Sequence, residues 1–319
     1  MLKFAIVGLG VMGKNHFRAL QNISGIKLAA VCDPCISDTD VTALCRPFKE
    51  RNLAPKFYRD LDEMLAGEPL DAAIIATPTS LHKDAALKCM QKGVNLLIEK
   101  PVASNAADAQ ILLDEAQRIN LKVAIGHIER FNPSVVALKN ELENEEIFSI
   151  RITRNAPFPQ RIADVGILTD LAVHDIDLIR YLSRKEIKDM SVMSSKKLHA
   201  KFEDNANLSF LLEGEILASI STSWLAPKRE RKIEVACKGA YFEADMLAQT
   251  LVKFTEFDAN SYRVQNCFVK RADALTSELE SFVHLLNGGE QEGATIKDSL
   301  QTLKIIERTG KFTSRSLQI

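Results

Sequence analysis

The chain has 319 residues, of which 46% are hydrophobic and 26% are charged. These values are ordinary for a globular protein, and the length suggests two domains of about 150 residues each. The 41 basic and 42 acidic side chains leave a formal net charge of −1, so no basic excess favours nucleic-acid binding. No apolar run reaches the ~18–20 residues of a membrane helix, and the first residues resemble a strand rather than a signal peptide. We therefore expect a soluble, cytoplasmic protein that binds neither nucleic acid nor membranes.

The six cysteines are too sparse for a disulfide scaffold of this length. Cys32 and Cys35 have a CxxC spacing, but a structural zinc site needs a second pair at similar spacing. A redox pair usually begins a helix, and this pair does not. We interpret the spacing as chance and predict no metal site.

Residues 1–125 alternate between strand-like and helix-like segments. Each strand-like run is short and almost continuously apolar, which is typical of strands buried on both faces. The alternation predicts an α/β domain with a doubly wound parallel sheet. The expected strands are Phe4–Val7, Lys27–Val31, Ala72–Ala76, Val94–Ile98 and Lys122–Ile125, and the expected helices are Val11–Gln21, Thr39–Arg51, Ser80–Gln91 and Asn105–Asn120.

The pattern changes in residues 126–319, where helices are fewer and alternating strands dominate. Residues 187–270 have the alternation and tight turns of successive strands, and Thr295 and Asp298 have the spacing of a capping box. We predict a second, α+β domain on an open, mostly antiparallel sheet. The other expected elements are a strand at Phe148–Arg154 and helices at Pro133–Leu142, Gly166–Ser183, Ala274–Leu286 and Thr295–Thr309.

A glycine motif connects the first strand to the first helix. Gly8 allows a tight turn, Gly10 lets the backbone approach a pyrophosphate, and Gly13 lets the helix pack closely on the strand. Asp33 ends the second strand, where its carboxylate can accept both ribose hydroxyls and would repel a 2′-phosphate. No basic residue follows Asp33 before Arg46. The motif therefore predicts NAD rather than NADP.

Two proline turns follow later strands, at the sheet edge where doubly wound folds bind their ligands. They are Thr77-Pro78 and Glu99-Lys100-Pro101. Proline favours an extended backbone at the preceding residue, and this directs the Lys100 amine toward the expected nicotinamide position. A partly desolvated lysine can serve in acid/base chemistry. The alternative is a surface lysine at a turn.

Asp170 and His174 lie four residues apart in an apolar helical run, with Asp177 one turn later. This spacing puts a carboxylate and an imidazole on one helix face. A carboxylate beside an imidazole can fix its tautomer and raise its basicity, as a general base requires. The alternative is a helix pair with a structural role.

Taken together, these motifs resemble the Gfo/Idh/MocA family (glucose-fructose oxidoreductase, inositol dehydrogenase and relatives) over essentially the whole chain. The resemblance implies an N-terminal Rossmann domain over residues 1–125 and a substrate-binding domain over residues 126–319, whose open sheet often mediates homodimers or homotetramers. It also implies a cis peptide bond before Pro101. Residues 126–133 and 157–177 are similar to UDP-N-acetylglucosamine 3-dehydrogenase-like members, although Gln160 replaces a proline of their PFPPRI run.

The resemblance implies three groups of site residues. The expected catalytic residues are Lys100, His174 and Asp170, where either His174 or Lys100 is the base. The expected substrate contacts are Lys100, Arg130, Asn132, Arg161, Asp170 and His174. The expected NAD contacts are Gly8, Gly10, Val11, Met12, Gly13, Asp33, Thr77, Pro78, His82, Glu99 and Lys100.

Three functions fit these motifs. The first is NAD-dependent oxidation of a sugar hydroxyl at C3 of a UDP-N-acetylhexosamine. The second is the same chemistry on a free sugar, polyol or inositol. The third is a non-catalytic NAD(H)-binding sensor, which would need only the motifs of the first domain.

Overall fold

The computed structural model describes residues 1–49, 54–159, 166–258 and 260–313. The chain falls into two units, of which the first contains Met1–Ile128 and Leu275–Leu303. The second contains Glu129–Ala274 and the chain from Lys304 onward. None of the helices in these ranges is both long and apolar enough to cross a membrane.

The first unit has a parallel sheet with the strand order β3-β2-β1-β4-β5-β6. This order confirms the expected Rossmann domain, because the chain turns back across the sheet after β3 to place β4 beside β1. Every residue of β4 is buried, as its continuous apolar run predicts. The strands are β1 (Leu2–Val7), β2 (Ile26–Cys32), β3 (Lys56–Tyr58), β4 (Ala72–Ile75), β5 (Asn95–Glu99) and β6 (Val123–Gly126).

Helices flank this sheet at or near the expected positions. Asn105 caps α5, because its side chain accepts a hydrogen bond from the backbone N–H of Asp108. The sequence reading missed β3 and α3, which are too short to show a periodic pattern. The helices are α1 (Val11–Leu20), α2 (Asp38–Lys49), α3 (Leu61–Gly67), η1 (Thr79–Leu81), α4 (His82–Gln91), α5 (Ala106–Arg118), α8 (Ala274–Leu286) and α9 (Ile296–Thr313), of which α9 belongs to this unit only as far as Leu303.

The return of Leu275–Leu303 to the first unit differs from the continuous second domain expected from the sequence. Hydrophobic packing explains it. Leu279 and Phe282 of α8 are buried in one core of the first unit, where the Phe282 ring meets Phe4 edge-on with 5.9 Å between centroids. Leu300 and Leu303 of α9 are buried in another. The capping box of α9 is confirmed, since Asp298 accepts from the N–H and hydroxyl of Thr295 at 2.9 Å.

The second unit is built on an open sheet with the strand order β14-β13-β12-β11-β7-β10-β9-β8. Neighbouring strands are antiparallel except β7 and β10, which are parallel. This architecture confirms the expected open, mostly antiparallel sheet. Its strands are β7 (Ile147–Asn155), β8 (Ile187–Ser195), β9 (Asn205–Leu212), β10 (Leu217–Ser223), β11 (Glu230–Cys237), β12 (Ala240–Asp245), β13 (Thr250–Thr255) and β14 (Arg263–Asn266).

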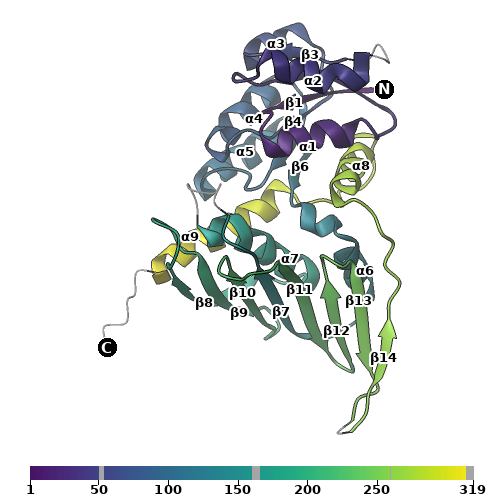
Figure 1. Cartoon of the computed structure of the whole chain (residues 1–319), viewed down its shortest axis with the longest axis vertical. Helices are drawn as coiled ribbons and strands as arrows, with labels where there is room; N and C mark the ends of the chain where they lie inside the picture. Colours follow the sequence, from purple (N-terminus) through teal and green to yellow (C-terminus); the bar gives the residue numbers. More distant parts are fainter. Residues whose placement is uncertain (50–53, 160–165, 259, 314–319) are drawn as a thin grey trace. The chain divides into compact units, whose positions relative to one another are not determined.

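Helices cover one face of this sheet, with α6 (Pro133–Glu141) against β12 and β13 and α7 (Val173–Ser183) against β7 and β10 (Figure 1). The short turn η2 (Ile128–Phe131) precedes α6. The expected helix at Gly166–Ser183 differs in one respect, because a π-helical turn, η3 (Leu168–Ala172), leads into α7. Turns of this kind are frequent at functional sites.

Candidate active site

In the glycine turn after β1, backbone segments lie too close together for side chains at Gly8 and Gly13. Gly8 has a φ of +96°, and a Cβ there would lie 2.7 Å from the backbone of Ala76. A Cβ on Gly13 would lie 1.9 Å from the carbonyl oxygen of Gly8, so helix and strand pack too closely for any side chain. A Cβ on Gly10 would meet nothing within 4 Å. This open space at the start of α1 fits a pyrophosphate, and Val11 and Met12 follow as the first helical residues.

Asp33 joins the end of β2 to this turn. One oxygen of its carboxylate accepts from the N–H of Leu9 at 2.6 Å, and the other accepts from the N–H of Cys35 at 2.8 Å. These bonds hold a charged group beside the glycine turn, with further lone pairs for ribose hydroxyls. The cysteines on either side, Cys32 and Cys35, are free thiols.

Replacing Asp33 with asparagine should lower NAD affinity about tenfold, because a neutral amide is a weaker acceptor than a carboxylate. NADP should lose less, since the charge that repels its 2′-phosphate is gone. Titration calorimetry with both dinucleotides measures the two affinities. Asp62→Asn, at an exposed carboxylate of the same unit, is the control. An unchanged ratio of the two affinities would contradict the assigned role.

The His82 side chain connects the two proline turns through hydrogen bonds to their backbone. It is buried, and its ring nitrogens lie 2.9 Å from the carbonyl oxygen of Pro101 and 2.8 Å from that of Thr77. Burial lowers the pKa of His82, and the bonds to the two carbonyl oxygens oppose that shift. The peptide bond between Lys100 and Pro101 is cis, as the resemblance implied. His82 thus acts on the backbone of both turns, and its expected contact with NAD stays a prediction.

Two further side chains at this edge are informative. The hydroxyl of Thr77 is buried and has no hydrogen-bond partner within the described part of the chain, which fits a residue whose partner is a ligand. Glu99 is bonded to His16 of α1, with 2.6 Å between Oε1 and Nε2, directly before the half-buried Lys100. His16 was not singled out from the sequence. Its position in α1, three residues after Gly13 of the glycine motif, was the available signal.

In the second unit, Asp170 lies on the π-helical turn and His174 in the first turn of α7. Both are half-buried, whereas Ala172 and Val173 between them are fully buried. Asp170 and His174 therefore lie at the margin of the core that Ala172 and Val173 enter, whereas Asp175 and Asp177 further along the same helix are buried. Arg161 and Gln160, from the expected substrate loop, lie outside the described residues.

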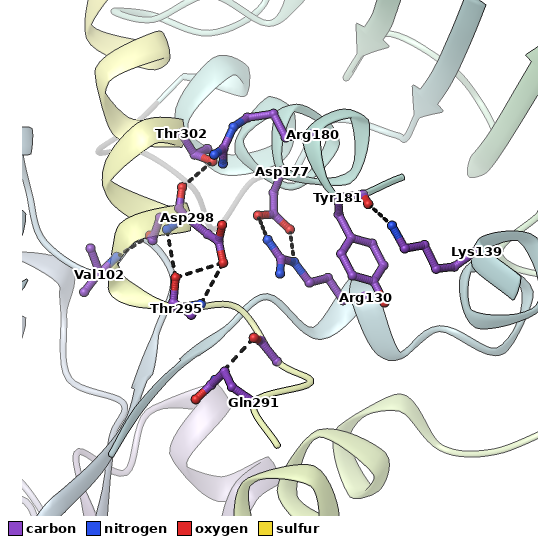
Figure 2. Close-up of polar contacts among 12 residues, drawn as sticks. Val102, Arg130, Lys139, Asp177, Arg180, Tyr181, Gln291, Thr295, Asp298 and Thr302 are labelled. Atoms are coloured by element: carbon purple, nitrogen blue, oxygen red, sulfur yellow. Dashed lines mark hydrogen bonds and ion pairs between the residues drawn. The ribbon is translucent and has the colours of Figure 1, made fainter. Parts of the chain in front are cut away.

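Arg130 and Asp177 form a bidentate ion pair, with 2.8 Å and 2.7 Å between nitrogens and oxygens (Figure 2). The Arg130 guanidinium also lies 4.7 Å from the ring centroid of Tyr181. The Lys139 ammonium donates to the backbone carbonyl of Tyr181. Burial, with the charges of Arg184 and Arg130, lowers the pKa of Lys139 to about 8. Arg130 therefore fixes α7, and its contact with substrate stays a prediction.

The side chain of Asn132 caps the N-terminus of α6. Its side-chain oxygen accepts from the N–H and hydroxyl of Ser134, and its amide donates to the carbonyl of Met246 at 3.0 Å. Asn132 is also buried. These bonds make it a capping residue, and a role with substrate is likewise still a prediction.

A buried charge network, which the sequence reading missed, lies next to these residues. Arg154 of β7 binds Asp175 of α7 through bonds of 2.7–3.0 Å and Glu129 of η2 at 2.8 Å. Arg231 of β11 binds the same Glu129 oxygen at 2.8 Å. Burial raises the pKa of Asp175, and Arg154 opposes that rise. Two cations and two anions thus connect the turn η2 and both strands to the helix that carries His174.

Comparisons with known proteins agree with this architecture. Residues 2–127 match the model of an oxidoreductase family with an NAD-binding Rossmann fold, and residues 143–243 match the GFO/IDH/MocA C-terminal domain. The chain belongs to the GFO/IDH/MocA oxidoreductase family. Its cofactor is therefore NAD, and the open space at Gly10 and the buried Thr77 hydroxyl fit that cofactor.

Two members of the GFO/IDH/MocA family show how far the similarity extends. The UDP-N-acetylglucosamine 3-dehydrogenase of Acidithiobacillus ferrooxidans is 28% identical over 89% of this chain and 88% of its own length. A solved structure of that enzyme superposes with a TM-score of 0.88 at 25% identity, covering 100% of this chain and 99% of the other. The myo-inositol 2-dehydrogenase of Thermotoga maritima is 26% identical over 95% of this chain and 93% of its own length.

Proposed function

We propose that the protein is a dehydrogenase that oxidises C3 of a UDP-N-acetylhexosamine. The observation that carries this proposal is the similarity to a UDP-N-acetylglucosamine 3-dehydrogenase along nearly the full length of both chains. The Lys100 turn and the Asp170–His174 helix support it, because a sensor of NAD(H) would need neither. Family membership and the NAD-binding turn do not depend on this choice of substrate.

The reaction removes a proton from the hydroxyl and a hydride from its carbon. NAD, when bound, accepts the hydride. We assign the proton to His174, whose position on a partly exposed helix face suits a general base, and Asp170 to orienting its imidazole. Lys100 would donate to the reacting oxygen and stabilise the negative charge that develops there. Arg161 would suit a nucleotide phosphate, because a guanidinium can bind phosphate through two parallel hydrogen bonds.

We also propose that the protein is a homodimer or homotetramer in the cytoplasm. The sheet of the second unit exposes large apolar side chains on several of its strands, including Phe148 of β7, Leu211 of β9 and Leu217 of β10. Leu211 and Leu217 are directly paired across their strands. Contiguous exposed apolar side chains of this kind favour association.

A second candidate is a dehydrogenase of a free sugar, polyol or inositol. It is favoured by the similarity to a myo-inositol 2-dehydrogenase, which covers more of this chain at nearly the same identity. Both candidates use the same chemistry, so the nucleotide is what distinguishes them.

The test mixes the protein with a stoichiometric amount of NAD and follows the absorbance of the reduced cofactor. UDP-N-acetylglucosamine, N-acetylglucosamine and myo-inositol are compared, each with and without 2-oxoglutarate. The 2-oxo acid would reoxidise a cofactor that stays bound and would itself be reduced to the 2-hydroxy acid. With it, the absorbance of the reduced cofactor should fall back while the 2-hydroxy acid accumulates over repeated turnovers. We expect UDP-N-acetylglucosamine to reduce NAD and the other two compounds not to reduce it.

Each alternative result has a distinct meaning. Reduction by N-acetylglucosamine or myo-inositol but not by UDP-N-acetylglucosamine would establish the second candidate. Reduction by none of the three, with NAD binding confirmed by calorimetry, would overturn both candidates and favour the sensor.

A further inference from the structure

An ionisable side chain is buried on α8 without a hydrogen-bond partner. Glu278 is 3% exposed, whereas Glu280 on the same helix is exposed. Neither oxygen of the Glu278 carboxyl has a hydrogen-bond partner within the part of the chain that the structure describes. Its helix neighbours Leu279 and Phe282 enter the core of the first unit, and their packing takes Glu278 inside with them. A buried polar group without a partner is rare and calls for an explanation.

The charge that acts on Glu278 is Glu99, the residue directly before Lys100. Glu99 is nearly buried, and its Oε1 lies 2.6 Å from His16 Nε2. Its other oxygen faces Gly126 of β6, where an added Cβ would be only 3.1 Å away. The absence of a side chain at Gly126 therefore leaves the space that the Glu99 carboxyl occupies. Lys122 is a further cation of this unit. Its ammonium donates to the carbonyl oxygens of Leu285 and Leu286, at the opposite end of α8 from Glu278.

Two buried carboxyls whose charges act on each other cannot both be charged at low cost. Glu99 has a histidine partner for its charge, and Glu278 has none. The proton is therefore best placed on Glu278. Its burial and the Glu99 charge both raise the pKa of Glu278 well above its ordinary value. A neutral carboxylic acid still loses hydrogen bonds on burial, but it avoids the much larger cost of a buried unpaired charge.

We propose that Glu278 is a neutral carboxylic acid at neutral pH and a positioning residue for the Lys100 turn. In this role it leaves Glu99 as the single negative charge of the buried group, bonded to His16. Ionisation of Glu278 would put a second negative charge against Glu99 and loosen the turn that carries Lys100. The effect on Lys100 rests on the proposed function, whereas the neutral state of Glu278 does not.

The test of the neutral state measures stability without any substrate. Because the pKa of Glu278 is higher in the folded protein than in the unfolded chain, its stabilisation is complete at low pH and is lost as pH rises. Urea unfolding of the wild type and of Glu278→Gln, at a series of pH values from acidic to alkaline, should therefore diverge. The folding constant of the wild type should fall relative to the variant by up to about tenfold per pH unit.

Glu280→Gln is the matched control, because its exposed carboxylate should give a curve parallel to that of the wild type. Glu278→Met, which is neutral at every pH, replaces the glutamine variant if the latter does not fold. Parallel pH curves for the wild type and the Glu278 variants would overturn the proposal.

The positioning role needs a separate readout. NAD affinity of Glu278→Gln at neutral pH should match that of the wild type, and its loss of kcat toward alkaline pH should begin at a higher pH. If kcat of Glu278→Gln falls at the same alkaline pH as kcat of the wild type, Glu278 has no positioning role. If the unfolding curves diverge but no sugar reduces NAD, the neutral acid stands and the proposed function fails.

Discussion

Replacing Lys100 with methionine should lower kcat by about 10³-fold. Methionine keeps the length and apolar stem of the side chain but removes the ammonium that would stabilise the reacting oxygen. NAD affinity should change far less, because the glycine turn and Asp33 lie elsewhere along the sheet edge. Stopped-flow measurement of cofactor reduction gives the rate, and calorimetry gives the affinity. Near-normal turnover by this variant would remove Lys100 from the mechanism.

The same variant identifies the base when its pH profile is compared with that of His174→Gln. The acidic limb of kcat/KM belongs to the group that must lose its proton. If His174 is the base, the limb persists in the Lys100 variant and disappears in the His174 variant. The reverse pattern would assign the base to Lys100. Lys92→Met, at an exposed lysine of the same unit, should leave both the rate and the profile unchanged.

The sheet of the first unit was predictable because its strands are buried on both faces. A short, continuous apolar run such as that of β4, bounded by polar residues and turns, is typical of a strand that is buried on both faces. The glycine turn was equally clear, since Gly8 and Gly13 occupy positions where a Cβ would clash with backbone. Three-residue β3 and seven-residue α3 were missed, because a pattern needs more residues than that to repeat.

The position of α8 could not be read from its sequence. Its apolar residues predict a buried face, but they do not say which core covers it. Leu279 and Phe282 would pack as well on the open sheet as on the core that contains Phe4. Only the folded chain shows that 275–303 belongs to the first unit.

The buried charges were invisible for a different reason. Arg154 and Glu129 are residue types that usually lie at the surface. Strand alternation places Arg154 on the face of Ile150 and Ile152, but it does not show that a charged side chain at that position is buried. Their burial depends on partners that come from separate elements. The same holds for His16 and Glu99, which are 83 residues apart.

Replacing Arg154 with methionine should destabilise the protein by about 3–5 kcal/mol, the usual cost of removing one partner from a buried ion pair. The substitution leaves Asp175 buried without the Arg154 guanidinium and takes one cation away from Glu129. Urea unfolding measures the loss. Arg151 lies on the same strand as Arg154, and Arg151→Met breaks a mostly exposed contact of 3.4 Å with Glu234 of β11. This variant should cost less than about 1 kcal/mol. Equal costs for the two variants would show that the network adds nothing to stability.

The pH dependence of the Arg154 variant shows whether Asp175 causes this cost. Burial raises the pKa of Asp175 above its unfolded value, and Arg154 opposes the rise, so its removal raises that pKa further. A raised folded-state pKa means that stability is retained at low pH and lost as pH increases. The penalty should therefore be smaller near about pH 5 than near about pH 8, and adding Asp175→Asn should recover part of it. Because Asp175 directly follows His174 in α7, the same variant should also lower kcat more than its remaining folded fraction explains.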